Sequence, residues 1–204
     1  EDTSIYFFET SLPKQAASVA GKAELEENGE NLALVLRRIL TDEDKKRALF
    51  NLVRHVLPFI EKIDVTRYLN KYLQIVLKET YSSAGNVPSF LMSDGTIILL
   101  ALIIAIYFEQ KPLSIFDEPE RSIHPYLISK LIEMMREASA QKQIIVATHH
   151  PEVVKYAGLD NLLLVQRDKN GFSVVNRPNE KREIKTFLKN EIGIEELYVQ
   201  NLLG

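Results

Sequence analysis

The segment from Ile97 to Phe108 constrains the fold more than any other part of the chain, because it is apolar on every side. A helix on the surface of a domain carries a polar face, and this segment has none. It is also well short of the roughly 20 apolar residues that a membrane-spanning helix needs. The segment therefore predicts a helix buried between the layers of a globular domain.

Two short apolar runs further along the chain indicate a parallel sheet. The run Leu113–Phe116 is followed by a turn, by a helix that can begin at Pro125, and then by the β-branched run Gln143–Ala147. A strand, a helix and a second strand, each strand apolar with a polar C-terminal end, form a parallel βαβ unit. We therefore predict an α/β fold.

Charged side chains follow both predicted strands at the point where each strand ends. Asp117 and Glu118 come directly after the first apolar run, and His149 comes shortly after the second. Ligands of parallel sheets bind at this edge, and a nucleotide-hydrolysing site presents there a metal-associated Asp and a water-activating Glu. A plainer interpretation is an ordinary strand end followed by a polar turn, with the histidine as a structural cap.

Small polar residues stand directly before the buried helix. The hydroxyl groups of Ser93 and Thr96 and the backbone N–H groups around Gly95 could meet an anion at the helix N-terminus. The alternative is a plain N-cap, in which Ser93 or Asp94 accepts hydrogen bonds from the first amides of the helix.

The rest of the chain predicts shorter elements. The apolar periodicities and turn residues give the following segments: strands at 5–8, 68–79 and 162–165, helices that begin after Asn31 and after Thr41 or Asp42, a hairpin turn at 168–171 with its return strand at 172–175, and helices at 181–190 and 194–202.

Composition bounds the class of protein. The chain has 204 residues, of which 46% are hydrophobic and 26% charged, as in an ordinary globular protein with one sizeable core. Its net charge of −3 gives no global basic bias toward nucleic acid. The chain contains no Cys, which excludes disulfides and Cys-ligated metals. With no secretory signal and no transmembrane segment in the sequence, we expect a cytoplasmic protein.

The Gly21-Lys22 pair matches only the Gly-Lys dipeptide of a phosphate-binding loop. Ala23 stands where the loop needs Ser or Thr, and Ala16 stands where it needs the first Gly, so the pattern fails. We therefore expect that loop, and the Q-loop glutamine that accompanies it, upstream of residue 1.

Three segments stand in an order typical of one ATPase group: Met92–Thr96, Ile115–Glu120 and Ala147–His150. This order resembles the C-terminal half of ABC-type P-loop ATPases, and most of all the RecF/SMC/OLD-like group of AAA-type ATPases. The Glu-Arg-Ser-Ile-His-Pro sequence of Glu120–Pro125 is closer to that group than to transporter subunits. The resemblance covers residues 31–165 and implies a P-loop NTPase-type, mostly parallel sheet flanked by helices, with a helical insertion.

The resemblance also implies a division of the chain into three parts. Residues 1–67 would form an N-terminal strand and a helical lobe, and residues 68–178 would form the ATPase core with its motifs. Residues 179–204 would form C-terminal helices.

The motif residues take their expected roles from the resemblance. Asp117 would be the Walker B aspartate that holds Mg²⁺ through its water shell, and Glu118 would be the general base for the attacking water. His149 would be the switch histidine at the γ-phosphate. The signature segment would reach a nucleotide held by a second subunit, and its implied residues are Ser93, Asp94, Gly95 and Thr96. The D-loop would lie at the dimer interface, and its implied residues are Glu120, Ser122 and His124.

The implied cofactors are ATP and Mg²⁺, and the implied assembly is a homodimer bridged by ATP. The resemblance suggests DNA repair, DNA maintenance or phage defence, with DNA and an associated nuclease or effector as partners. Two other classes stay open: a transporter-type ATPase subunit, and a regulatory fragment without catalysis. Without a phosphate-binding loop of its own, the 204-residue chain is expected to be inactive alone.

Overall fold

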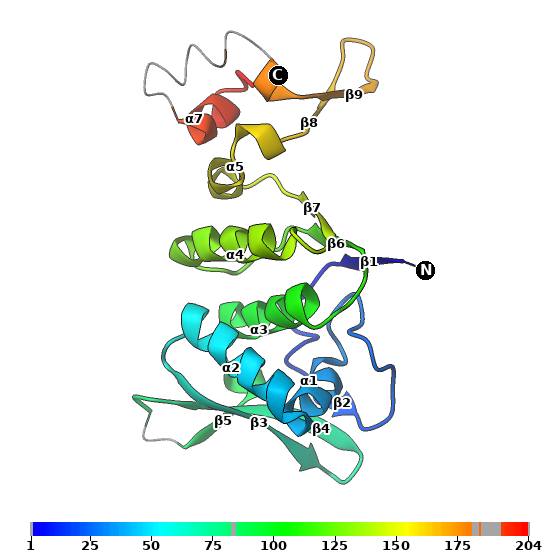
Figure 1. Cartoon of the computed structure of the whole chain (residues 1–204), viewed down its shortest axis with the longest axis vertical. Helices are drawn as coiled ribbons and strands as arrows, with labels where there is room; N and C mark the ends of the chain where they lie inside the picture. Colours follow the sequence, from blue (N-terminus) through cyan, green and yellow to red (C-terminus); the bar gives the residue numbers. More distant parts are fainter. Residues whose placement is uncertain (1, 83–84, 181–183, 185–192, 204) are drawn as a thin grey trace. The chain divides into compact units, whose positions relative to one another are not determined.

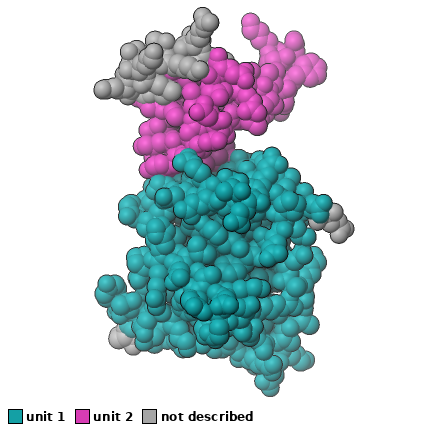
Figure 2. All heavy atoms as spheres, viewed as in Figure 1, with its two compact units in different colours: residues 1–147 teal, residues 148–204 magenta. Residues whose placement is uncertain are grey.

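The computed structural model describes residues 2–82, 85–180, 184 and 193–203 of the chain (Figure 1). These residues form two compact units, 1–147 and 148–204 (Figure 2). The boundary between the units follows the last strand of the parallel sheet. The three parts predicted from the sequence, 1–67, 68–178 and 179–204, have other boundaries and stay a prediction.

A three-stranded parallel sheet carries the acidic motif of the first unit. Strand β6 (Leu113–Asp117) lies between β1 (Thr3–Tyr6) and β7 (Gln143–Ala147), and both neighbours run parallel to it. The register pairs Tyr6 with Phe116 on one side and Asp117 with Ala147 on the other. The predicted parallel βαβ unit is confirmed, with α4 (Pro125–Ala138) as its helix.

The predicted buried helix is α3 (Asp94–Tyr107), and every residue from Thr96 to Ile106 is buried. It packs against α4 and against α2 (Glu43–Val56), which precedes it in the chain (Figure 1). Helices on two sides thus cover a segment that has no polar face. This arrangement confirms the mixed α/β fold with helices beside a parallel sheet.

A second sheet in the first unit was not predicted. Its four strands are antiparallel, with β4 (Tyr72–Glu79) in the middle of β2 (Ala17–Ser18), β3 (Ile60–Tyr68) and β5 (Asn86–Pro88). Helix α1 (Leu32–Thr41) packs against β3, β4 and α2. The helical lobe therefore rests on a sheet of its own.

Several predicted bounds need correction. The strand predicted over 68–79 begins only at Tyr72, because a tight turn with positive φ at Leu69 and Asn70 joins it to β3. Asn31 precedes α1 without a side-chain cap, whereas Asp42 caps α2 by accepting hydrogen bonds from the amides of Asp44 and Lys45. The polar segment before α3 contains the short 3₁₀ helix η1 (Ser89–Leu91) as well as β5.

The second unit contains α5 (Pro151–Ala157), η2 (Leu159–Asn161), η3 (Pro178–Glu180) and α7 (Ile194–Val199). Strands β8 (Leu164–Arg167) and β9 (Ser173–Asn176) form the predicted hairpin, with bounds shifted toward the C-terminus. The core of the second unit contains four buried residues: Val154, Ile184, Leu197 and Leu203. Most of the helix predicted at 181–190 lies outside the described residues. In the part of the chain that the structure describes, no helix has both the length and the apolar character to cross a membrane.

A buried carboxylate anchors the segment before α1 to the end of α3. The Glu109 side chain is 8% exposed, and its Oε1 accepts a hydrogen bond from the Leu25 amide at 2.9 Å. The ammonium of Lys142 donates to the carbonyls of Ala105 and Glu109 at 3.1 and 3.2 Å, so it satisfies groups at the C-terminal end of α3. Burial raises the pKa of Glu109, and Glu24 adds to this effect, while the Leu25 amide, Lys142 and Lys111 lower it.

This environment predicts the pH dependence of a Glu109→Gln variant. Because the folded state binds the Glu109 proton more tightly than the unfolded state, the wild type loses stability as pH rises from 4.5 through the raised pKa. Gln cannot ionise, and its oxygen can still accept from the Leu25 amide. The variant should therefore match the wild type at low pH and exceed it near neutrality, as measured by urea unfolding across the pH range. Parallel stability curves for the two proteins would contradict this account.

Candidate functional site

The acidic motif lies at the C-terminal end of β6, as the sequence predicts. Asp117 is the last residue of the strand and is exposed, and Glu118 begins the turn that follows. The Glu118 amide donates a hydrogen bond to the Ala147 carbonyl at 2.9 Å, so the ladder between β6 and β7 extends to this residue. Glu118 has a φ of 44°, a left-handed conformation that non-glycine residues rarely adopt. Such strain clusters at functional sites, where the surroundings hold it.

The 118–124 loop continues as two tight turns. The amide of Arg121 donates to the Glu118 carbonyl, and the amide of Ile123 donates to the Glu120 carbonyl, each at 3.0 Å. Ser122 is a second non-glycine residue with positive φ, at 63°. Glu120 and Ile123 are 6% and 7% exposed, so the loop is fastened into the unit by two buried side chains. It is therefore a shaped segment and not a free linker.

His124 ends the loop in a structural role. Its Nδ1 accepts a hydrogen bond from the Tyr126 amide at 3.3 Å, and His124 thereby caps α4, whose first residue is Pro125. The predicted D-loop residue thus positions the helix that follows. Its expected place at a dimer interface stays a prediction.

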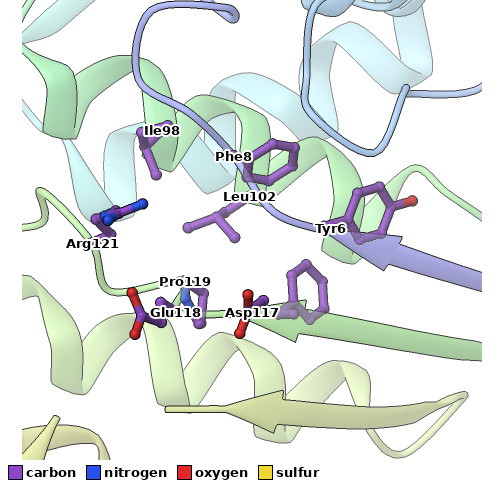
Figure 3. Close-up of a pocket in the computed structure, with 9 residues that line it drawn as sticks. Tyr6, Phe8, Ile98, Leu102, Asp117, Glu118, Pro119 and Arg121 are labelled. Atoms are coloured by element: carbon purple, nitrogen blue, oxygen red, sulfur yellow. The ribbon is translucent and has the colours of Figure 1, made fainter. Parts of the chain in front are cut away.

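A shallow pocket brings the acidic pair together with residues from β1, α3 and the loop (Figure 3). The Asp117 and Glu118 carboxylates lie along one side, and Ile98 and Leu102 of α3 lie on the other. Arg121 places a permanent cation in the same pocket. The remaining lining residues are Tyr6, Phe8, Phe116 and Pro119.

Two pocket residues, Phe8 and Arg121, were not predicted from the sequence. Phe8 follows β1, and it reaches the pocket because β1 pairs with β6, a contact between segments far apart in the chain. Arg121 lies inside the predicted D-loop but carried no expected role. The Arg side chain between two motif residues was the only signal in the sequence that pointed to it.

An aromatic cluster forms the inner wall of the pocket. The Tyr6 ring stacks on Phe116 with centroids 5.3 Å apart and packs on Phe8 at 5.6 Å. Burial raises the pKa of the Tyr6 hydroxyl to about 12, the nearby Ser4 side chain opposes this shift, and Glu109, Glu24 and Glu27 add smaller increases. Tyr6 therefore stays neutral at physiological pH, and the carboxylates and Arg121 carry the charge of this pocket.

The signature segment, defined as Ser93–Thr96, forms the N-terminus of α3. The Ser93 Oγ accepts a hydrogen bond from the Thr96 amide at 3.1 Å and lies 2.6 Å from the Thr96 Oγ1. The plain N-cap considered in the sequence analysis is thus present. Asp94 forms an ion pair with Lys14, which lies in the loop after β1.

The signature segment packs directly on the 118–124 loop. A Cβ atom added to Gly95 would lie 2.8 Å from the backbone oxygen of Ser122, so only glycine permits this approach. Two motifs that stand apart in the sequence therefore meet, backbone against backbone, beside the acidic pair.

His149 belongs to the second unit, so its predicted position beside the acidic pair stays a prediction. The side chain is exposed, two residues beyond the end of β7. Its neighbour His150 caps α5, because its Nδ1 accepts a hydrogen bond from the Glu152 amide at 3.3 Å.

Most of the chain matches a known protein family. Residues 11–155 match the family described as "AAA domain, putative AbiEii toxin, Type IV TA system". The match spans the acidic pair, the signature segment, the antiparallel sheet, and strands β6 and β7 of the parallel sheet. The chain belongs to this AAA family. The ATPase kinship that the motifs indicate is therefore confirmed.

Solved structures similar to this AAA-family chain are heads of SMC ATPases. A structure from a study of ATP-driven dimerisation and DNA-stimulated activation of SMC ATPases has a TM-score of 0.56 and 21% identity, over 78% of this chain and 96% of the other. An SMC head bound to the C-terminal winged-helix domain of ScpA has a TM-score of 0.53 and 20% identity, over 72% of this chain and 49% of the other. At these identities the likeness establishes the fold.

A curated relative is an uncharacterised protein of Methanocaldococcus jannaschii. It is 30% identical over 91 residues, which make up 43% of this chain and 24% of the relative. The chain thus spans about a quarter of the length of the curated relative it matches.

The residues of this AAA-family site fit Mg²⁺ only in combination with a bound phosphate. Among the described residues, no group of three or more His, Asp or Glu side chains is arranged to hold a metal ion. Mg²⁺ is usually held by one or two carboxylates together with waters and substrate phosphates. The exposed Asp117 carboxylate beside Glu118 matches that donor set.

The contact between Gly95 and Ser122 predicts the effect of a Gly95→Ala variant. In an unobstructed helix this change adds roughly 0.5–1 kcal/mol of stability. Here the new methyl group meets a backbone oxygen, and we expect a loss of about 1–3 kcal/mol, measured by denaturant unfolding. Adding Ser122→Ala should not restore stability, because the obstacle is the backbone oxygen. A Gly95→Ala protein as stable as the wild type would contradict the proposed close packing.

Proposed function

We propose that this chain carries the water-activating half of a Mg²⁺-dependent ATPase site and works as a dimer switched by ATP. The observation that carries the proposal is the packing of Gly95 against the Ser122 backbone beside the Asp117–Glu118 pair. It joins the segment that would reach a partner's nucleotide to the loop that begins at the catalytic carboxylate. A structural change at either segment would therefore displace the other.

Each acidic residue has a distinct task in this proposal. Asp117, at the exposed end of β6, would hold the ion through its water shell, and Mg²⁺ would neutralise the charge on the transferred phosphoryl group. Glu118, which follows the strand in a left-handed conformation, would accept a proton from the attacking water. Arg121 would place a fixed positive charge near the phosphates. His149 would reach the γ-phosphate from the end of β7.

The dimer is supported by the chemistry of the signature segment. Ser93 and Thr96 place hydroxyl groups at the N-terminus of a long helix, where an anion is favoured. ATP-driven dimerisation is named for SMC ATPases whose structure resembles this chain. Glu120, Ser122 and His124 would lie close to the partner in the same closed state. ATP would then act as the ligand that populates the closed dimer.

The process served is proposed from kinship. DNA-stimulated activation is named for the same SMC ATPases, and a toxin–antitoxin system is named in the description of the matched family. We propose a role in DNA maintenance or phage defence, in which DNA or an associated effector controls hydrolysis. The net charge of −3 means that any DNA contact would use a local basic surface.

The role of Glu118 is tested by a Glu118→Gln variant of the intact protein. Loss of the general base should lower kcat for ATP hydrolysis by about 10²–10⁴-fold, because Gln cannot accept the proton. ATP should still bind, and the ATP-bound dimer should accumulate on size exclusion with light scattering. Glu133→Gln, at an exposed position of α4, serves as the control. ATP turnover by Glu118→Gln at the wild-type rate would rule out this assignment.

The role of the signature segment is tested by comparing Ser93→Asp with Ser93→Asn. Both residues can cap α3, so the helix should form in each variant. Only Asp places a negative charge where the partner's phosphates are proposed to bind. We expect Ser93→Asp to abolish the ATP-dependent dimer while each monomer still binds ATP, and Ser93→Asn to retain most of it. Equal dimerisation by the two variants would exclude a phosphate at this helix end.

A further inference from the structure

The loop after β1 connects the acidic pocket to the signature segment. It leaves the sheet at Tyr6, contributes Phe8 to the pocket, and turns twice, with amide-to-carbonyl hydrogen bonds of 3.1 Å from Leu12 to Glu9 and from Gln15 to Leu12. Lys14 lies in the second turn. The loop therefore places a lysine between two parts of the proposed ATPase site.

Two contacts fasten Lys14 to the segment that leads into α3. The Lys14 ammonium pairs with the Asp94 carboxylate, and the hydroxyl of Ser89 donates a hydrogen bond to the Lys14 carbonyl at 2.7 Å. Ser89 is fully buried, so the donor side of this partly buried hydrogen bond is shielded from water. Side chain and backbone of Lys14 thus both contact residues 89–94, which lie about 80 positions later in the chain.

The cation of the Lys14–Asp94 pair is more buried than those of most ion pairs among the described residues, and only Lys111, 24% exposed in its pair with Glu24, comes close. The Lys14 side chain is 18% exposed, whereas Lys22, which pairs with Glu26, is 71% exposed. A largely buried ammonium needs a charge partner, because its lost hydration is otherwise uncompensated. Asp94 supplies that partner while remaining 50% exposed itself.

The negative charge of Asp94 disfavours an anion at the N-terminus of α3, and the positive charge of Lys14 offsets it. A carboxylate at the first residue of α3 is stabilised by the helix dipole but repels any anion that approaches the same helix end. A cation held against this carboxylate cancels most of that repulsion. The ion pair also holds the Asp94 carboxylate in one position, so that it does not rotate over the N-terminus of α3.

We propose that Lys14 is a positioning residue for the signature segment, which neutralises Asp94 and thereby allows this segment to accept the triphosphate of a second copy of the chain. The inference rests on the proposed ATP-switched dimer and adds a residue to it. It also gives a physical route from the pocket to the dimer interface, because the β1 loop contacts both through Phe8 and Lys14.

The test uses the intact protein and measures ATP-dependent dimerisation together with kcat and KM for ATP hydrolysis. Lys14→Gln keeps a side chain that can donate to Asp94 but removes the charge, so dimer formation should fall by about tenfold or more. The affinity of the monomer for ATP should not change. Lys14→Arg retains the charge and should retain the dimer.

A double variant separates neutralisation from a purely structural role. If Lys14 acts by cancelling the charge of Asp94, adding Asp94→Asn to Lys14→Gln removes the repulsion and should restore dimerisation. Lys22→Met, which removes a lysine from an exposed ion pair, is the control and should change nothing. Thermal unfolding of every variant shows whether a lost dimer reflects a lost fold.

Three results would overturn the inference. Unchanged dimerisation in Lys14→Gln, with the dimer of Ser93→Asp lost, would reject Lys14 and leave the proposed function intact. Equal loss in Lys14→Gln, Lys14→Arg and the double variant would show that the side chain acts by packing and not by charge. If Ser93→Asp also dimerises normally with ATP, the proposed dimer fails and this inference fails with it.

Discussion

The burial of α3 is the constraint on which the rest of the first unit depends. A helix that is apolar on all sides is stable only when it is covered on all sides, and α2 and α4 supply contacts along it. Because the helix is fixed along its length, its N-terminus is fixed as well. The signature segment therefore has a defined position even though its own residues are small and partly exposed.

The position of α3 also determines how closely the motif loops can approach each other. Gly95 meets the Ser122 backbone, and Ser122 and Glu118 both adopt left-handed conformations without being glycines. Such conformations persist when the surroundings hold them, here through the buried Glu120 and Ile123 and the extended ladder to β7. These contacts hold the acidic turn in one conformation, which suits the proposed role of placing a water molecule accurately.

The sequence predicts those parts of the fold that local patterns determine. Helix α3, strands β6 and β7 and the Asp42 cap follow from apolar runs and capping residues within a few positions of each other. Strand β3 escaped prediction because charged residues interrupt its alternation and a bulge shifts its register near Ile60. The turn at Leu69–Asn70 was not predicted, because it adopts positive φ without containing a glycine.

The residues of the candidate site also fall into those that local patterns predict and those that they do not. Asp117, Glu118 and the signature segment are visible in the sequence because strand ends and helix starts carry local patterns. The place of Phe8 and the pairing of Lys14 with Asp94 depend on contacts between distant segments, which periodicity does not encode. Arg121 lies in the motif loop itself, but no local pattern gives it a role. The role of Gly95 is intermediate: the motif marks the glycine, but only the approach of the Ser122 carbonyl explains it.

The central claim is that the acidic turn and the signature segment serve one nucleotide site shared by two copies of the chain. A crystal structure of the intact Glu118→Gln protein with ATP and Mg²⁺ tests it most directly. The account predicts Asp117 beside the hydrated ion of one subunit and Ser93 of the other subunit in contact with the same γ-phosphate. A nucleotide bound away from Asp117, or one whose phosphates meet only residues of a single subunit, would contradict the account.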